Sequence, residues 1–72
     1  MSKQYTTRTG LVQYKPSFKQ VQNMEDNMRG FCLACGKTQS GVEPDARKYE
    51  CEHCGKPKVY GPEELVLMGL VY

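Results

Sequence analysis

The residues with the clearest chemistry in this chain are four cysteines, which stand in two similar frames. One frame reads CLACGK at residues 32–37 and the other CEHCGK at residues 51–56, with fifteen residues between the cysteine pairs. Two residues between paired cysteines let both sulfurs of a tight turn reach one ion, and two such pairs form a tetrahedral set of thiolate ligands. We therefore expect one Zn2+ ion, held by Cys32, Cys35, Cys51 and Cys54.

Each frame continues with a glycine and a lysine after its second cysteine. Gly36 and Gly55 can adopt a positive φ without steric cost, which turns backbone N–H groups toward the sulfurs. A zinc ion with four thiolates carries a net negative charge. We expect these N–H groups, together with Lys37 and Lys56, to offset that charge.

One further residue could be a ligand in these frames, and iron is the main alternative to zinc. His53 lies inside the second frame and could replace Cys51 or Cys54, but the cysteine set is already complete, so we expect His53 to be exposed. Iron in a rubredoxin-like site is the main alternative metal, although the frames lack proline and the spacing between the pairs is short. A thioredoxin-type redox role is disfavoured because no βαβ pattern surrounds either pair.

The size of the chain gives the metal a structural role. With 72 residues, no tryptophan and 39% hydrophobic residues, there is room for one small core. Such a core rarely supplies more than about 3–5 kcal/mol, whereas binding of a structural zinc contributes on the order of 10 kcal/mol to folding. We expect residues 31–68 to depend on the ion for their structure.

The sequence indicates a cytoplasmic protein without membrane contact. It lacks the layout of a signal peptide and has no apolar run near the ~20 residues of a membrane span. In a reducing cytosol, paired cysteines are metal ligands rather than disulfides.

The net charge argues against strong electrostatic binding of nucleic acid by the metal module alone. The formal charge is +2, and four thiolates with one Zn2+ ion bring it near zero. Residues 1–30 carry five basic and two acidic residues, whereas residues 31–72 carry five basic and six acidic residues. The positive charge therefore lies in the N-terminal part.

Three segments must position the cysteines. We interpret residues 1–16 as a basic arm that is flexible or a hairpin, residues 17–30 as a short amphipathic helix, and residues 31–72 as the metal module with an apolar tail. Ser17 and Gln20 fit a capping box, and Gly30 is placed to end a helix over residues 18–29. The apolar stripe of that helix consists of Phe18, Val21, Met24 and Met28.

Within the metal module the pattern predicts strands around the second frame. We expect a strand at residues 48–50 leading into Cys51, a loop at residues 38–45, and a returning strand at residues 58–60. Pro62 followed by two glutamates favours the start of a short helix or turn that runs to Met68.

Residues 31–37 together with residues 47–56 resemble the zinc-ribbon superfamily, which includes small domains of transcription elongation factors and RNA polymerase subunits. Residues 41–67 also resemble small zinc-ribbon proteins of bacteriophages and prophages, most of unknown role; a phage origin would imply the host-cell cytoplasm. The implied fold is a small metal-stabilised ribbon: two cysteine knuckles, a short antiparallel β-sheet, a short N-terminal helix and a short C-terminal helix or turn. Asp45 stands alone, so the acidic pair of elongation-factor ribbons is missing.

The first functional hypothesis is contact with DNA, RNA or RNA polymerase. Basic residues interleave with Tyr49 and Tyr60 near the second frame, and others lie in the N-terminal arm. The candidate contact residues are Lys3, Arg8, Lys15, Lys19, Arg47, Lys48, Lys56 and Lys58. The competing interpretation is that these lysines and arginines are solvated and the tyrosines are core.

The second hypothesis is a protein partner or a homodimer formed through the apolar tail, residues 65–72. Its large apolar or aromatic residues are Leu65, Val66, Leu67, Met68, Leu70, Val71 and Tyr72. Part of this tail must cover the strands, and the rest would form an interface. An enzyme is not expected, because a closed four-cysteine site binds no water and no nucleophile–base pair is present.

Overall fold

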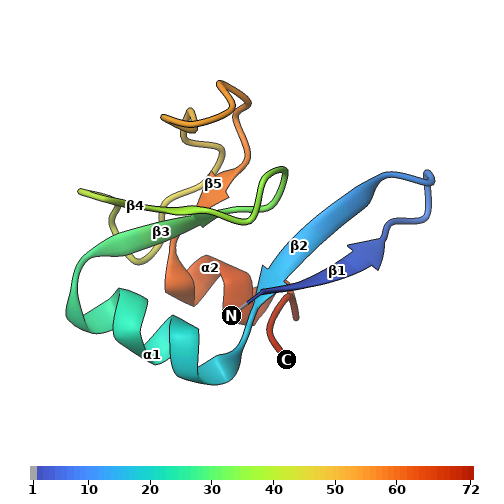
Figure 1. Cartoon of the computed structure of the whole chain (residues 1–72). Helices are drawn as coiled ribbons and strands as arrows, with labels where there is room; N and C mark the ends of the chain where they lie inside the picture. The colour runs from blue at the N-terminus through green and yellow to red at the C-terminus, as the bar shows by residue number, and fades with distance from the viewer. Residues whose placement is uncertain (1) are drawn as a thin grey trace.

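The computed structural model describes residues 2–72, which contain five strands and two helices (Figure 1). In chain order these are β1 (Ser2–Thr6), β2 (Val12–Pro16), α1 (Phe18–Asp26), β3 (Arg29–Cys32), β4 (Thr38–Ser40), β5 (Val59–Tyr60) and α2 (Pro62–Leu67). β1 and β2 form one two-stranded antiparallel sheet, and the order β4-β3-β5 forms another, also antiparallel.

The N-terminal residues form a hairpin that stands beside the rest of the molecule (Figure 1). Tyr5 lies opposite Gln13, and its hydroxyl donates a hydrogen bond of 2.7 Å to the Gln13 side chain. The hairpin is joined to the first cysteine frame because the Tyr14 N–H donates to the Leu33 carbonyl at 2.8 Å. The arm is therefore positioned by a backbone bond next to Cys32.

The strands of the metal module differ from the sequence prediction. Residues 38–45 do not form only a loop, because β4 pairs with β3 over Thr38 to Ser40. The strand expected at residues 48–50 is reduced to a single bridge between Tyr49 and Val59, and Lys48 has a left-handed φ of 53°. A left-handed residue interrupts an extended strand, so of these two strands only the returning one forms, as β5 at Val59–Tyr60 instead of residues 58–60.

α1 begins where the sequence predicts and ends earlier. The Ser17 hydroxyl accepts from the Gln20 N–H at 3.2 Å, which confirms the serine half of the predicted capping box, whereas the Gln20 side chain makes no return bond to Ser17. The helix ends at Asp26 instead of residue 29, and Met28 takes the left-handed conformation that was expected of Gly30. Gly30 lies inside β3, where an added Cβ would come within 2.6 Å of Val42, so its role is close packing.

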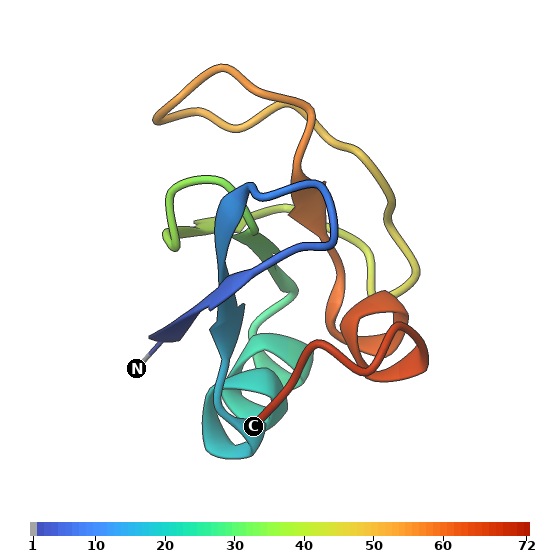
Figure 2. The ribbon, with the colours of Figure 1, turned by 90° about the vertical axis from the view of Figure 1, so that its right-hand side faces the viewer.

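α2 begins at Pro62 as predicted and is followed by a segment that returns to the hairpin. The Tyr72 N–H donates to the Pro16 carbonyl, and the Tyr72 carbonyl accepts from the Phe18 N–H. Figure 2 shows this C-terminal segment running to the start of α1. The end of the described chain thus ties β2 to α1.

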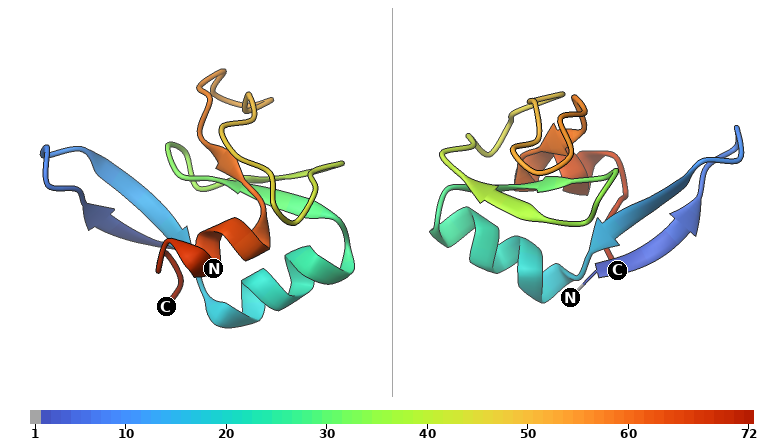
Figure 3. Two further views of the ribbon diagram at one scale, coloured as in Figure 1. Left: turned by 180° about the vertical axis from the view of Figure 1, so that it is seen from behind. Right: turned by 45° about the horizontal axis from the view of Figure 1, so that its top comes forward.

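The two helices cover one side of the central sheet, and the loops that carry the second cysteine frame lie on the other side (Figures 1 and 3). Adjacent residues of β3 and β5 point to opposite sides. Phe31 and Tyr60 join the helix-side core with Val21, Met24, Leu33 and Leu65. Cys32 and Val59 join a second core with Val42, Ala46 and Cys51.

No helix within residues 2–72 is long and apolar enough to cross a membrane.

Candidate metal centre

The four cysteine sulfurs form one cluster. All four Sγ atoms lie within 4.8 Å of one another, and the Cys32–Cys54 and Cys35–Cys51 pairs are each separated by 3.6 Å. A disulfide has a length of about 2.05 Å, so these sulfurs are not bonded. A tetrahedron with Zn–S bonds of about 2.3 Å has S···S edges of about 3.8 Å, which the two short separations approach.

The two frames have nearly the same backbone geometry. In each, the N–H of the first cysteine donates to the carbonyl of the lysine, at 2.9 Å from Cys32 to Lys37 and 3.0 Å from Cys51 to Lys56. In each, the glycine N–H donates back to the carbonyl of the first cysteine at 2.9 Å. Gly36 and Gly55 have φ values of 78° and 74°, so the predicted positive φ is confirmed. Similar local sequences therefore build two similar knuckles.

Backbone N–H groups surround the sulfurs and change their proton affinity. Burial acts to raise the pKa of Cys51, but N–H groups of Cys54 and His53 and the neighbouring thiols outweigh it and lower this pKa to about 6. The N–H groups of His53 and Cys54 lie 3.3 and 3.4 Å from the Cys51 Sγ. Burial raises the pKa of Cys32 to about 12, against opposing backbone hydrogen bonds from Cys35 and Ala34. Donors aimed at Cys51 favour the thiolate form that a metal requires.

Gln39 fixes the entry to the second frame, and sequence reasoning did not identify this residue. Its buried side chain donates to the Glu50 carbonyl at 3.2 Å and accepts from the Glu52 N–H at 3.0 Å. The two bonds lie on either side of Cys51 and supplement the single bridge that residues 48–50 make to β5. No sequence motif marks Gln39, because its role depends on β4 pairing with β3.

The remaining residues of the frames are outside the sulfur cluster. The side chain of His53 is exposed, as predicted, and His53 does not belong to the cluster. Lys37 and Lys56 are exposed, and within residues 2–72 neither side chain hydrogen-bonds to a sulfur. The donor set is thus four sulfurs, which suits a zinc ion and leaves no oxygen or nitrogen ligand in the cluster.

The basic residues that were expected to form a contact surface are distributed over several places. Lys3 lies over the ring of Tyr72 and Lys15 over the ring of Tyr5, with Nζ 5.7 and 5.6 Å from the ring centroids. Arg47 forms an ion pair of 2.9 Å with Glu64, so its charge is already compensated.

The other candidates are one pair and three single residues. Lys56 and Lys58 line a hollow beside the hairpin. Lys19 lines a different pocket together with Arg29, a residue that sequence reasoning did not single out. Arg8 and Lys48 are exposed and line neither.

Comparisons of the chain with family models, with curated proteins and with solved structures found no match. The resemblance to zinc ribbons and to phage proteins therefore stays a prediction. The structure by itself supports a four-cysteine metal-binding module built from short antiparallel strands and two short helices.

Proposed function

We propose that this protein is a non-enzymatic zinc-ribbon module that holds one structural Zn2+ ion and binds nucleic acid through its hairpin and second knuckle. The donor set supports the first part, since four cysteine ligands fill a tetrahedral shell and leave no position for water or substrate. The ion would then act as a scaffold, and function lies on the surfaces that it holds together.

The observation that carries the nucleic-acid proposal is a shallow hollow of about 100 Å³ between the hairpin and the two knuckles. We call it the hairpin–knuckle face, and its residues are Leu11, Val12, Gln13, Ala34, Lys56 and Lys58. No carboxylate is among these residues. Leu11 and Val12 are more than half exposed, which places apolar surface next to two cations.

Two lysines beside exposed apolar side chains suit a nucleic acid strand, which offers both phosphates and apolar surfaces. Lysine side chains contact phosphates, while apolar surface can contact bases or sugars without sequence preference. The hairpin adds Lys3, Arg8 and Lys15 and contains no acidic residue. Lys56 and Lys58 thus supply the positive charge of the hairpin–knuckle face, and the basic residues of the arm add positive charge elsewhere along the hairpin.

The test is the salt dependence of binding to short single-stranded DNA and RNA, measured by fluorescence anisotropy with the zinc-loaded protein. The double variant Lys56→Gln with Lys58→Gln should weaken binding and lower the slope of log affinity against log salt by about 0.7 for each lost phosphate contact. The backbone carbonyl of Lys56 still accepts from Cys51 in this variant, so the knuckle is preserved.

Lys48→Gln is the matched control, because it removes an exposed positive charge that does not line the hairpin–knuckle face. We expect the control to bind as the unchanged protein does. Absence of binding at low salt, or equal losses in Lys48→Gln and in the double variant, would contradict the nucleic-acid proposal.

A protein partner is the second candidate, and the exposure of α2 favours it. Leu67 is 79% exposed and Val66 is 51% exposed, and both line a shallow cavity of about 270 Å³ together with Glu25 and Glu63. In the rest of the predicted tail interface, Leu65 is buried and Leu70 and Val71 pack on the core, whereas Met68 and Tyr72 are exposed. Sedimentation of the unchanged protein and of Leu67→Gln tests a homodimer, which requires a larger mass that the variant loses.

A further inference from the structure

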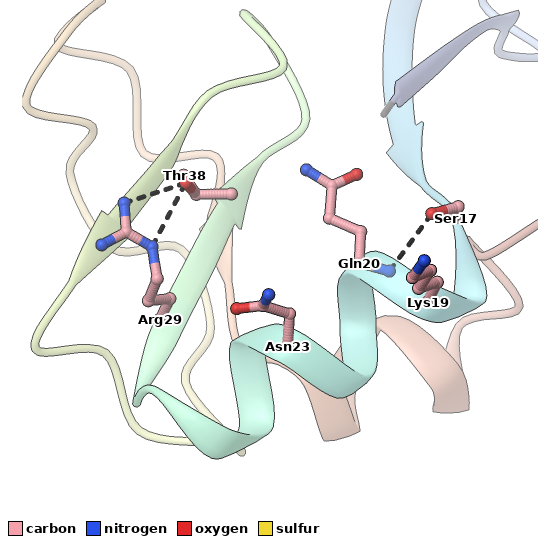
Figure 4. A pocket seen from close by; sticks show the side chains of 6 residues that line it. All are labelled: Ser17, Lys19, Gln20, Asn23, Arg29 and Thr38. Carbon is pink, nitrogen blue, oxygen red and sulfur yellow. Dashed lines mark hydrogen bonds between the residues drawn. The ribbon is translucent and has the colours of Figure 1, made fainter.

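A polar pocket of about 330 Å³ opens between α1 and the β3–β4 pair, away from the cysteines. Figure 4 shows the side chains that line it: Ser17, Lys19, Gln20, Asn23, Arg29 and Thr38. Two of these side chains are cationic, and none of them is a carboxylate. The ion pair recorded within residues 2–72 joins Arg47 to Glu64 and involves neither cation of this pocket.

Three of the four side-chain oxygens that line the pocket, those of Ser17, Asn23 and Thr38, already accept hydrogen bonds. Thr38 Oγ1 accepts from Nε and Nη2 of Arg29 at 3.3 and 2.9 Å. Asn23 Oδ1 accepts from the Asn27 amide at 2.8 Å, and Ser17 Oγ accepts from the Gln20 backbone N–H. Because these oxygens are engaged, a ligand would meet mainly donors.

The donors in the same pocket remain available. Two of the five N–H groups of Arg29 are used by Thr38, and the bonds to Thr38 hold the guanidinium in place. The NH2 group of Asn23 and the ammonium of Lys19 add further donors. Together they form a concave set of donors with a charge of +2, which is the complement of an oxyanion.

Gln20 provides an independent sign that the pocket is incomplete. In a capping box the Gln20 side chain would bond the Ser17 N–H, but it extends from α1 toward the sheet instead (Figure 4). Its Oε1 is buried and has no hydrogen-bond partner among residues 2–72. A buried carbonyl oxygen without a partner is costly, and it requires a donor, which a water bound with the ligand or the P–OH group of a singly charged phosphate can supply.

The position of Lys19 also indicates that the ligand is an anion. It lies in the first turn of α1, where no acidic residue is present. A cation at the positive end of a helix is unfavourable on its own, and an anion beside it would compensate.

We propose that this pocket binds a phosphate group, carried either by a small phosphorylated molecule or by a nucleic acid backbone. The volume exceeds that of one ion and leaves room for the group that carries the phosphate. The pocket shares no lining residue with the hairpin–knuckle face, so phosphate binding here can be tested independently of the proposed function.

The test is an NMR titration of the full zinc-loaded chain with inorganic phosphate, at constant ionic strength and with stoichiometric zinc because free zinc precipitates phosphate. We expect saturable shifts of the Arg29 Nε–H and the Asn23 side-chain NH2. Parallel titrations use a nucleoside monophosphate and a short single-stranded oligonucleotide. Absence of saturable shifts with all three probes would overturn the proposal.

Asn23→Asp is the sharpest variant, because it keeps the oxygen that Asn27 contacts and replaces the donor NH2 with a negative oxygen. We expect phosphate affinity to fall by about tenfold or more, as for the loss of a charge-assisted hydrogen bond. Gln22→Glu is the control: it adds the same charge at the preceding, exposed position, which does not line the pocket. Equal losses in the two variants would overturn the proposal.

Lys19→Gln is a second variant that should fold normally, since Lys19 is exposed. We expect it to weaken phosphate binding while leaving the spectrum of the unliganded protein unchanged outside α1. Unaltered phosphate affinity in both Lys19→Gln and Asn23→Asp would overturn the site.

The Asn23→Asp variant also distinguishes the two sources of the phosphate group. If it weakens binding of the oligonucleotide as well as of phosphate, the source is the nucleic acid backbone. If it weakens only the small probes, the source is a small phosphorylated molecule.

Discussion

Single side chains position the cysteines for metal binding, and Gln39 is the clearest example. The residues before Cys51 form only one bridge to β5, so the backbone on either side of this cysteine depends on side-chain hydrogen bonds. Gln39 supplies one bond to Glu50 and one to Glu52, and it is buried while doing so. A group that orients a ligand in this way contributes to metal affinity without touching the metal.

We predict that Gln39→Leu lowers zinc affinity by about 10-fold or more. Leucine keeps a similar volume but leaves the Glu50 carbonyl and the Glu52 N–H without their partner. Competition with a chromophoric zinc chelator measures the effect. Gln22→Leu makes the same change at an exposed position of α1 and should bind zinc normally. Zinc affinity that is equal in both variants would rule out a positioning role for Gln39.

At the scale of elements, the segment after α2 connects parts that are distant in the sequence. Leu70 and Val71 pack against the helix-side core, and the backbone of Tyr72 bonds to Pro16 and Phe18. This segment therefore fixes the junction between β2 and α1. The exposed residues Val66 and Leu67 precede it and make no such contacts with the core.

Deletion of residues 70–72 should destabilise the zinc-loaded protein by about 2–4 kcal/mol, through the loss of partly buried apolar surface and three backbone hydrogen bonds. Thermal unfolding with zinc present measures the loss. Leu67→Gln alters an exposed residue of the same region and should change stability by less than about 0.5 kcal/mol. A truncated protein as stable as this control would show that the segment is not structural.

At the scale of the whole molecule, the two small cores are linked through the alternation of β3 and β5. Phe31 pairs with Tyr60 on the helix side, and Cys32 pairs with Val59 on the cysteine side. Two of the five buried residues on the cysteine side, Cys32 and Cys51, belong to the sulfur cluster that could hold a metal ion. Loss of the ion would therefore disturb a core directly, and the effect would reach the helices through the shared strands.

We predict that a strong chelator unfolds residues 31–68 and that added zinc restores them. The physical reason is that residues 52–57 are exposed and have no apolar core of their own. Loss of amide chemical-shift dispersion in NMR spectra measures unfolding, and readdition of zinc controls for damage to the thiols. Retained dispersion in the chelated protein, with zinc loss verified by mass spectrometry, would refute a structural role for the metal.

The sequence alone was sufficient for features that depend on neighbouring residues. The cysteine spacing, the positive φ of Gly36 and Gly55, the cap at Ser17 and the start of α2 at Pro62 all follow from local geometry. Each is decided within a few residues, so the pattern of residue types carries it. Only the tertiary structure decided what depends on strand pairing, because short strands such as β4 gain their stability from partners remote in the chain.

This dependence on strand pairing explains why the structure around the cysteines differs from the sequence prediction. Pairing of β4 with β3 turned an expected loop into the strand that carries Gln39 and brought Arg29 to Thr38. Tertiary packing also decided which tail residues are buried. The cysteine frames and the ion expected there can therefore be predicted from the sequence. The phosphate pocket and the buried support of Cys51 arise from contacts between elements, which local spacing does not encode.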